Sequence, residues 1–270
     1  MQLVRAPLPV GAERALCFAF PGPNEGAKGP STGEPRALLS LRSQGDMRIR
    51  PGAVNPDRQR FFSDGGVDPD RVLGVKLAHS RSILFSADRD EHGRLAEEAL
   101  RSHGGADGIL TADPQLIPTI TAADCMPIWL LDRHSGWFGV LHSGWRGTGI
   151  LAAALGELRR RFGSPPSALA VILGPAIGSC CYDVPEERAT LFLERYGPRA
   201  AFRRDGAWRL DLREANLVIA EREGVGHLRS IDACTSCDPR LGSYRREGPQ
   251  AFTCMAASCG HFPEAAGVPA

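Results

Sequence analysis

Two short apolar runs joined by a turn constrain the fold of this chain more than any other feature. The runs are residues 128–131 and 137–141, and the polar, glycine-containing residues 132–136 are typical of a tight turn. A hairpin brings its outer ends together, so Cys125 and His142, which flank the runs, are expected to be near neighbours. Thiolate and imidazole are preferred ligands of zinc and also bind copper. The hairpin therefore predicts two ligands of a metal site.

A third ligand is expected from another strand end. Residues 72–78 have the composition of a strand, and His79 follows them directly. The set of His79, Cys125 and His142 leaves a fourth position open, which is the arrangement of a catalytic zinc that activates water. The pattern thus predicts a three-ligand metal centre.

Two other interpretations of these residues stay open at this point. In the first, the three residues are unrelated. In the second, Cys125 is the nucleophile of a hydrolase and His142 is its base. Asp124 or Ser143 would then support the pair.

Composition excludes several classes of partner. The net charge is +1 and no basic run is long, which argues against a nucleic-acid or membrane partner. The N-terminus lacks the apolar core of a signal peptide, and no later run has the length of a membrane span. A cytoplasmic location is expected, and no obligate protein partner is indicated.

The order of predicted elements indicates the α+β class. Strands and helices mix without strict alternation, so we expect a mixed β-sheet with helices on its faces, in a three-layer α/β/α arrangement. Residues 1–270 are expected to form one domain with a core at about 14–255. The glycine- and proline-rich residues 21–35 are predicted as a flexible loop, and residues 264–270 as a tail.

Local signals place several elements. Asn55 as N-cap and Pro56 at the first helical position predict a helix there. Apolar residues recur at helical spacing over 149–162, and Gly163 is expected to end that helix. Residues 243–254 are predicted as the last strand region.

Three longer motifs, residues 121–128, 142–148 and 173–184, make the chain resemble a known family. The chain is similar to the proteins once called multicopper polyphenol oxidases or laccase-domain proteins, now regarded as zinc-dependent purine nucleoside phosphorylases with adenosine deaminase activity. The likeness covers about residues 14–255.

The resemblance implies a metal, substrates and catalytic residues. It implies zinc, with copper as the alternative, at His79, Cys125 and His142. The implied small-molecule substrates are phosphate and purine nucleosides: adenosine and inosine, with guanosine and methylthioadenosine as further candidates. Cys125 and His142 are then candidate catalytic residues, and Asp124 is either a general acid/base or a cap of its turn.

Phosphorolysis also needs a phosphate site. Arg146 lies at a predicted strand-to-helix junction, where free N–H groups and the positive end of the helix favour an anion. Arg58 and Arg245 or Arg246 are further candidates. For each arginine, a structural salt bridge is the alternative.

The chain departs from the family pattern at three places. Leu77 stands where relatives have a glutamine, and residues 29–33 and 251–254 replace two further family segments. These departures bear on the substrate more than on the metal. The alternatives are a copper-dependent polyphenol oxidase, a cysteine-type hydrolase in peptidoglycan precursor editing, and a metal-stabilised interaction protein.

The C-terminal cysteines form a separate pattern. Cys234 and Cys237, with Cys254 and Cys259, have a spacing that a second, structural zinc can use. The alternative is that these thiols are buried or incidental. The adjacent pair Cys180–Cys181 is predicted to be sterically poor for chelating one ion.

Overall fold

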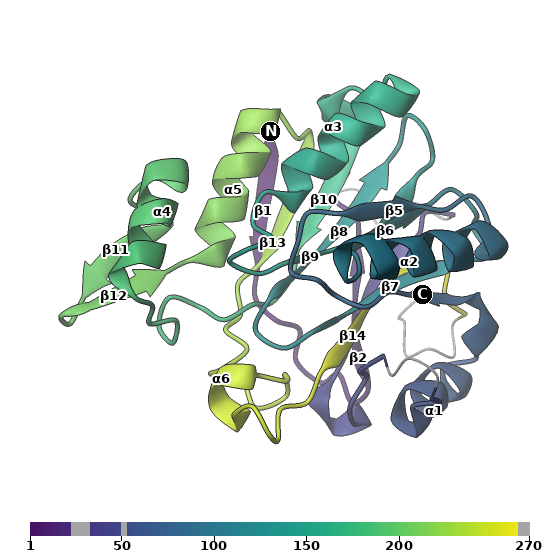
Figure 1. Cartoon of the computed structure of the whole chain (residues 1–270), viewed down its shortest axis with the longest axis horizontal. Coiled ribbons are helices and arrows are strands. Elements are labelled where there is room, and N and C mark those ends of the chain that lie inside the picture. The colour runs from purple at the N-terminus through teal and green to yellow at the C-terminus, as the bar shows by residue number, and fades with distance from the viewer. Residues whose placement is uncertain (23–32, 50–52, 264–270) are drawn as a thin grey trace.

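Two mixed β-sheets lie at the centre of the molecule (Figure 1). The structure, a computed structural model, describes residues 1–22, 33–49 and 53–263. The larger sheet has the order β1 (Gln2–Ala6), β13 (His227–Ile231), β10 (Leu169–Leu173), β8 (Met126–Asp132), β9 (Phe138–Ser143), β6 (Gly108–Thr111), β5 (Ile83–Phe85). The smaller has the order β2 (Ala15–Ala19), β3 (Arg36–Ser40), β14 (Met255–Gly260), β7 (Ile117–Ala122), β4 (Val72–Gly74).

The two sheets pack face to face over a shared apolar core. Strand β8 is buried along its whole length because both of its faces are covered. Successive side chains point to opposite faces: Trp129 packs towards the smaller sheet, whereas Ile128 and Leu130 pack towards the helices. The indole N–H of Trp129 donates to the carbonyl of Ser258 on β14 at 2.8 Å. Trp129 therefore joins the sheets by both packing and a hydrogen bond.

Helices cover the outer faces of this double sheet (Figure 1). Helix α3 buries Leu151, Leu155 and Leu158 against the larger sheet, while α1 packs Phe61 and Phe62 against the smaller one. The helices are α1 (Pro56–Asp64), α2 (Arg89–His103), α3 (Ile150–Phe162), α4 (Glu186–Tyr196), α5 (Leu212–Glu223) and α6 (Tyr244–Glu247). The smaller elements are the ribbon β11 (Ala201–Arg204) and β12 (Ala207–Leu210) and the 3₁₀ turns Arg42–Gln44, Pro69–Arg71 and Pro166–Ala168.

The α+β class, with mixed sheets and helices on the outer faces, is confirmed; the predicted middle layer consists of two sheets. The hairpin is also confirmed, with Pro127 of β8 opposite His142 of β9. The side chain of Asn55 caps α1 by accepting hydrogen bonds from two backbone N–H groups. Gly163 ends α3 in the left-handed conformation, as predicted.

The prediction of a strand over residues 243–254 is wrong. Residues Tyr244–Glu247 form the short helix α6, and the last strand begins at Met255. The carboxylate of Glu247 accepts hydrogen bonds from the N–H groups of Ser243 at 2.9 Å and Thr253 at 2.8 Å. These side-chain bonds take the place of a strand ladder in this segment.

Some predictions fall on residues that the structure does not describe. Most of the predicted loop at 21–35, most of the departure at 29–33 and the tail at 264–270 lie outside the described residues. Within the described part of the chain, no helix has the length and apolar composition to cross a membrane.

Two connections between the sheets carry two of the three predicted metal ligands. Residues 75–82 lead from β4 in the smaller sheet to β5 in the larger one, and residues 123–125 lead from β7 to β8 in the same sense. His79 lies on the first connection and Cys125 on the second. The strand predicted over residues 72–78 is therefore too long, because β4 ends at Gly74 and His79 does not follow it directly. His142 lies in β9, beside β8. The three predicted ligands therefore gather where the chain passes between the sheets.

Candidate functional site

The three predicted metal ligands lie together. One donor atom each from His79, Cys125 and His142 falls within 4.8 Å of the other two. The two imidazole rings meet edge to face, with their centroids 5.1 Å apart. His142 is buried, Cys125 is half-buried and His79 is exposed, so the group is open on one side. A nitrogen, sulfur and nitrogen donor set of this kind suits zinc or copper.

Asp107 orients both histidines. Its Oδ1 lies 2.9 Å from Nδ1 of His142 and accepts the backbone N–H of His79 at 3.0 Å. Its Oδ2 accepts hydrogen bonds from the N–H and the hydroxyl of Ser80 at 2.6 and 2.8 Å. Because Nδ1 of His142 faces Asp107, Nε2 is the ring nitrogen left for the site. A carboxylate behind a ligating histidine fixes the orientation and tautomer of the ring.

Sequence reasoning missed Asp107. It stands directly before β6, and its carbonyl accepts the N–H of His142 at 2.6 Å. An acidic residue at the start of a fully buried strand was the one available signal.

The backbone around the site adopts uncommon conformations. His79 has a φ of 56° and Asp124 a φ of 80°, both in the left-handed region that non-glycine residues rarely occupy. Gly144 passes so close to the site that a Cβ on it would lie 2.7 Å from Sγ of Cys125. Gly144 therefore leaves room for the sulfur of Cys125.

The thiol and imidazole shift each other's pKa. Burial alone raises the pKa of Cys125, but the charge of His142 and hydrogen bonds from His142 and His79 outweigh it and lower that pKa to about 6. Burial alone lowers the pKa of His142, but Cys125 and Asp107 raise it to about 9. Near neutral pH the metal-free pair is therefore a thiolate beside an imidazolium.

The contacts of Asp124 are those expected of a residue that caps its turn, rather than of a general acid/base. Its Oδ1 accepts the hydroxyl of Thr235 at 2.6 Å, and its Oδ2 accepts the N–H of Arg245 at 2.6 Å. Its carbonyl also accepts the N–H of Ile177. Ser143, the other predicted support for a hydrolase, contacts Asn216 of α5 instead.

A cavity of about 540 Å³ opens on the three ligands. This volume is typical of small-molecule sites. Leu77, where the resemblance predicts a glutamine, lines the cavity. Its other apolar and aromatic walls include Ile49, Val75, Trp145, Ile177, Tyr182, Tyr244 and Phe252.

The predicted phosphate ligands have different positions. Arg245 lines the cavity and donates to the carbonyls of Cys181 and Asp183 at 2.9 and 3.1 Å. Arg146 is exposed and is not among the lining residues, and its guanidinium lies 4.9 Å from the indole ring of Trp145. Arg58 is not among the lining residues either, and burial lowers its pKa to about 10.

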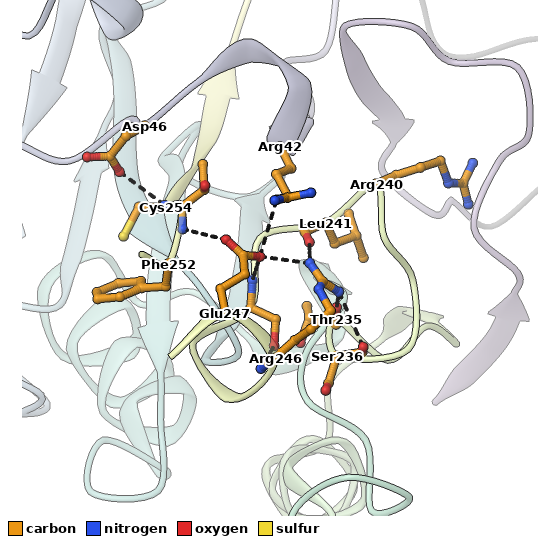
Figure 2. Close-up of polar contacts among 12 residues, drawn as sticks. Arg42, Asp46, Thr235, Ser236, Arg240, Leu241, Arg246, Glu247, Phe252 and Cys254 are labelled. Atoms are coloured by element: carbon orange, nitrogen blue, oxygen red, sulfur yellow. Dashed lines mark hydrogen bonds and ion pairs between the residues drawn. The ribbon is translucent and has the colours of Figure 1, made fainter. Parts of the chain in front are cut away.

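Arg246 has a structural role. Figure 2 shows its guanidinium among backbone carbonyls and beside Glu247. It donates to the carbonyls of Thr235 at 2.7 Å and Ser236 at 3.2 Å, and to Glu247 at 2.8 Å. These contacts match the salt-bridge alternative rather than a phosphate ligand.

Other cationic residues of the cavity were missed by sequence reasoning. Arg48, Lys76 and Arg188 line it together with Arg245. Nε of Arg188 is buried without a hydrogen-bond partner, and its guanidinium lies 4.2 Å from the ring of Trp145. Asp124 is the one carboxylate among the described lining residues. The cavity therefore favours an anion.

The predicted grouping of the C-terminal cysteines is wrong. Cys254 lies at the cavity wall and Cys259 is buried in the core between the sheets. Neither belongs to the thiol group that contains Cys234 and Cys237. The reason is that residues 254–260 run along the smaller sheet, away from the loop that carries residues 234–237.

Comparison with known proteins identifies the family. The sequence model described as multi-copper polyphenol oxidoreductase laccase matches residues 29–258. The chain belongs to this family. The predicted resemblance is therefore confirmed.

Curated relatives in the family carry the name purine nucleoside phosphorylase. YlmD of Geobacillus stearothermophilus is 32% identical over 73% of this chain and 75% of its own length. The Deinococcus radiodurans protein is 34% identical over 83% of this chain and 82% of its own length. LACC1 of Mus musculus is 26% identical over 78% of this chain, which spans only 48% of that relative.

Solved structures show the same fold. Bacillus licheniformis YfiH superposes with a TM-score of 0.76 at 23% identity, over 94% of this chain and 98% of that one. Geobacillus stearothermophilus YlmD superposes with a TM-score of 0.75 at 24% identity, over the same shares of the two chains.

Proposed function

We propose that this chain is a zinc-dependent purine nucleoside phosphorylase that also deaminates adenosine. The observation that carries the proposal is one cavity in which His79, Cys125 and His142 meet cationic and aromatic side chains. The names of the relatives support the same substrate class. Inosine and adenosine are the first substrates to test, followed by guanosine and methylthioadenosine.

Arg188 and Arg245 are the phosphate ligands that the cavity favours. Both line it, and arginine binds phosphate through charge-assisted hydrogen bonds. Lys76 is a third candidate, whereas Arg48 already pairs with Asp46 at 2.7 Å. The carboxylate oxygens of Asp124 are engaged by Thr235 and Arg245, which limits repulsion of an incoming anion.

The aromatic wall suits a purine base. The rings of Tyr244 and Phe252 lie edge to face with centroids 5.1 Å apart, and the guanidinium of Arg48 lies 4.6 Å from the ring of Phe252. Planar bases stack on such surfaces. In phosphorolysis the bound phosphate attacks C1′ of the ribose, the glycosidic bond breaks, and the purine base leaves.

His79, Cys125 and His142 would hold the zinc, with Asp107 orienting His142. A zinc ion held there would supply a Lewis acid that makes water nucleophilic near neutral pH, which adenosine deamination needs. The family description names copper, and these donors also bind copper. Three converging donors hold one ion, and one ion gives no evident route for the four-electron reduction of dioxygen. Zinc therefore ranks above copper.

The test measures product release by the purified chain. With inosine and inorganic phosphate we expect hypoxanthine and ribose 1-phosphate, and with adenosine we expect inosine and ammonia. Cys125→Ala is expected to lose the metal and both activities, while Cys17→Ala, at a half-buried thiol on β2, keeps them. Retention of metal and turnover by Cys125→Ala would refute the site. Copper-dependent oxygen uptake with a phenol, without base release from inosine, would favour the oxidase.

One observation favours a second candidate, a cysteine-type hydrolase. Asp107, His142 and Cys125 form a chain of acid, imidazole and thiol, as in a nucleophilic triad. Such a triad does not need His79, whereas the metal site does. His79→Ala would therefore abolish phosphorolysis if these residues hold a metal ion. The same variant would retain Cys125-dependent hydrolysis of a peptidoglycan precursor if the protein is a cysteine-type hydrolase.

A further inference from the structure

A second group of metal-ligating side chains lies outside the cavity. One sulfur each from Cys180, Cys181, Cys234 and Cys237 falls within 4.8 Å of the others. Sγ of Cys237 lies 3.4 Å from that of Cys181 and 3.6 Å from that of Cys180. The first two cysteines follow β10 and the other two follow β13. These neighbouring strands run parallel, so their ends meet at one edge of the sheet.

We propose that these four thiolates hold a structural zinc ion. In a tetrahedral zinc site with bonds of about 2.3 Å, the sulfurs are about 3.8 Å apart. The separations of 3.4 and 3.6 Å lie just below that value, and all four sulfurs are within 4.8 Å of one another, so small side-chain movements close the site. Cys237 approaches two sulfurs about equally, an arrangement that fits a shared ion better than one disulfide. Binding would release the thiol protons to solvent.

The backbone prepares the thiols for this role. The N–H of Gly178 donates to Sγ of Cys234 at 3.2 Å, a bond that stabilises a thiolate. A Cβ at Gly178 would lie 3.2 Å from Sγ of Cys180 and 3.4 Å from Sγ of Cys234, so glycine keeps the space open. A turn bond from Cys181 to Gly178 lets the adjacent thiols of Cys180 and Cys181 both approach Cys237. This geometry answers the prediction that the adjacent Cys180 and Cys181 are sterically poor for chelating one ion.

Arg246 holds the opposite turn. Its guanidinium donates to the carbonyls of Thr235 and Ser236, the two residues between Cys234 and Cys237 (Figure 2). It also donates to the carbonyl of Asp238 at 2.9 Å. A turn fixed at three carbonyls has less conformational freedom to lose when it binds an ion.

Two arginines contact the loop that carries Cys180 and Cys181. A zinc ion with four thiolates carries a net charge of −2, which nearby positive groups stabilise. Arg209 donates to the carbonyl of Cys180 at 3.3 Å, and Arg245 to that of Cys181 at 2.9 Å.

The ion would tie together two loops that frame the cavity. The loop with Cys180 and Cys181 also supplies Ile177 and Tyr182 to the cavity wall. The loop with Cys234 and Cys237 carries Thr235, which holds Asp124. All four positions of the site come from the protein, so its role is structural rather than catalytic.

The experiment counts zinc in the full-length chain. In a Cys125→Ala background, which removes the first site, we expect about one zinc ion per chain after zinc loading and desalting. Adding Cys237→Ser or Cys180→Ser is expected to remove it, whereas adding Cys17→Ser is not. Cobalt in place of zinc should give intense thiolate-to-cobalt absorption that Cys237→Ser abolishes.

A second measurement needs no substitution in the cluster. Zinc should protect the four cysteines from a thiol reagent, read out residue by residue by mass spectrometry, and a chelator should restore their reactivity. The proposal is overturned if Cys125→Ala binds no more zinc than its Cys237→Ser derivative. It is equally overturned if all four thiols react at the same rate with and without zinc.

Discussion

Asp107 holds His142 at two points, because its carboxylate lies 2.9 Å from ring Nδ1 and its carbonyl accepts the backbone N–H at 2.6 Å. The same carboxylate accepts the N–H of His79. One buried residue thus positions two of the three predicted metal ligands.

Asp107→Asn is expected to weaken metal binding about 10- to 100-fold while the chain stays folded. The amide keeps the shape of the side chain but removes the charge that supports His142. Metal affinity is measured by competition with a chromophoric chelator, and folding by circular dichroism. Asp113→Asn, on the turn after β6, is the matched control. Unchanged metal affinity in Asp107→Asn would show that the Asp107 carboxylate does not support the metal ligands.

Gly144→Ala is expected to abolish metal binding. The new methyl group would lie 2.7 Å from Sγ of Cys125, and β9 cannot shift without disturbing the buried sheet. Gly156→Ala is the matched control, because Gly156 is exposed on α3 with open space around its Cβ. That substitution should stabilise the chain by about 1 kcal/mol. Normal metal content in Gly144→Ala would show that the sulfur is not confined there.

Cys125 is expected to be alkylated with a midpoint near pH 6 in chelator-treated protein. The thiolate is the reactive form, so a lowered pKa extends reactivity to lower pH. Iodoacetamide labelling of the Cys125 peptide, followed by mass spectrometry across pH, gives the midpoint. In Asp107→Asn the midpoint should move up, because the imidazolium of His142 loses support. A wild-type midpoint above pH 8 would contradict the thiolate–imidazolium pair.

Arg188→Ala is expected to raise the KM for phosphate by about 10- to 100-fold, the effect of losing a charged hydrogen bond. Arg146→Ala should change it little, since Arg146 is exposed and does not line the cavity. Arg160→Ala, on the exposed face of α3, is the control. Initial rates with inosine at varied phosphate measure the effect. If Arg146→Ala raised the KM for phosphate more than Arg188→Ala did, Arg146 would again be the favoured phosphate ligand.

The parts of the site that were predictable from sequence depend on local patterns. The hairpin of β8 and β9 brings Cys125 to His142. The strand predicted over residues 72–78 points to His79, although β4 ends at Gly74 and His79 lies on the connection that follows it. Asp107 was not predictable, because its role depends on the pairing of β6 with β9. Arg188 enters the cavity from α4, and no local pattern links that helix to the hairpin.

The double sheet could not be predicted from the sequence for a similar reason. Strand β8 is apolar throughout, which indicates that both faces are covered but not whether a helix or a sheet covers them. Residues 243–254 contain strand-forming residues, yet Glu247 satisfies the backbone there and a short helix forms instead. Long-range packing decided the first case, and the local side-chain hydrogen bonds of Glu247 decided the second.

The passage of the chain between the two sheets has a consequence for folding. His79 and Cys125 both lie on segments that leave the smaller sheet and enter the larger one. Their donor atoms therefore converge only after the sheets have docked, a step that brings together segments far apart in the sequence and is slow compared with hairpin formation. In a refolding experiment, metal uptake at this centre should follow the recovery of secondary structure. The ion would then report on tertiary assembly, and a newly made chain would assemble the candidate metal centre only after residues 255–260 had completed the smaller sheet.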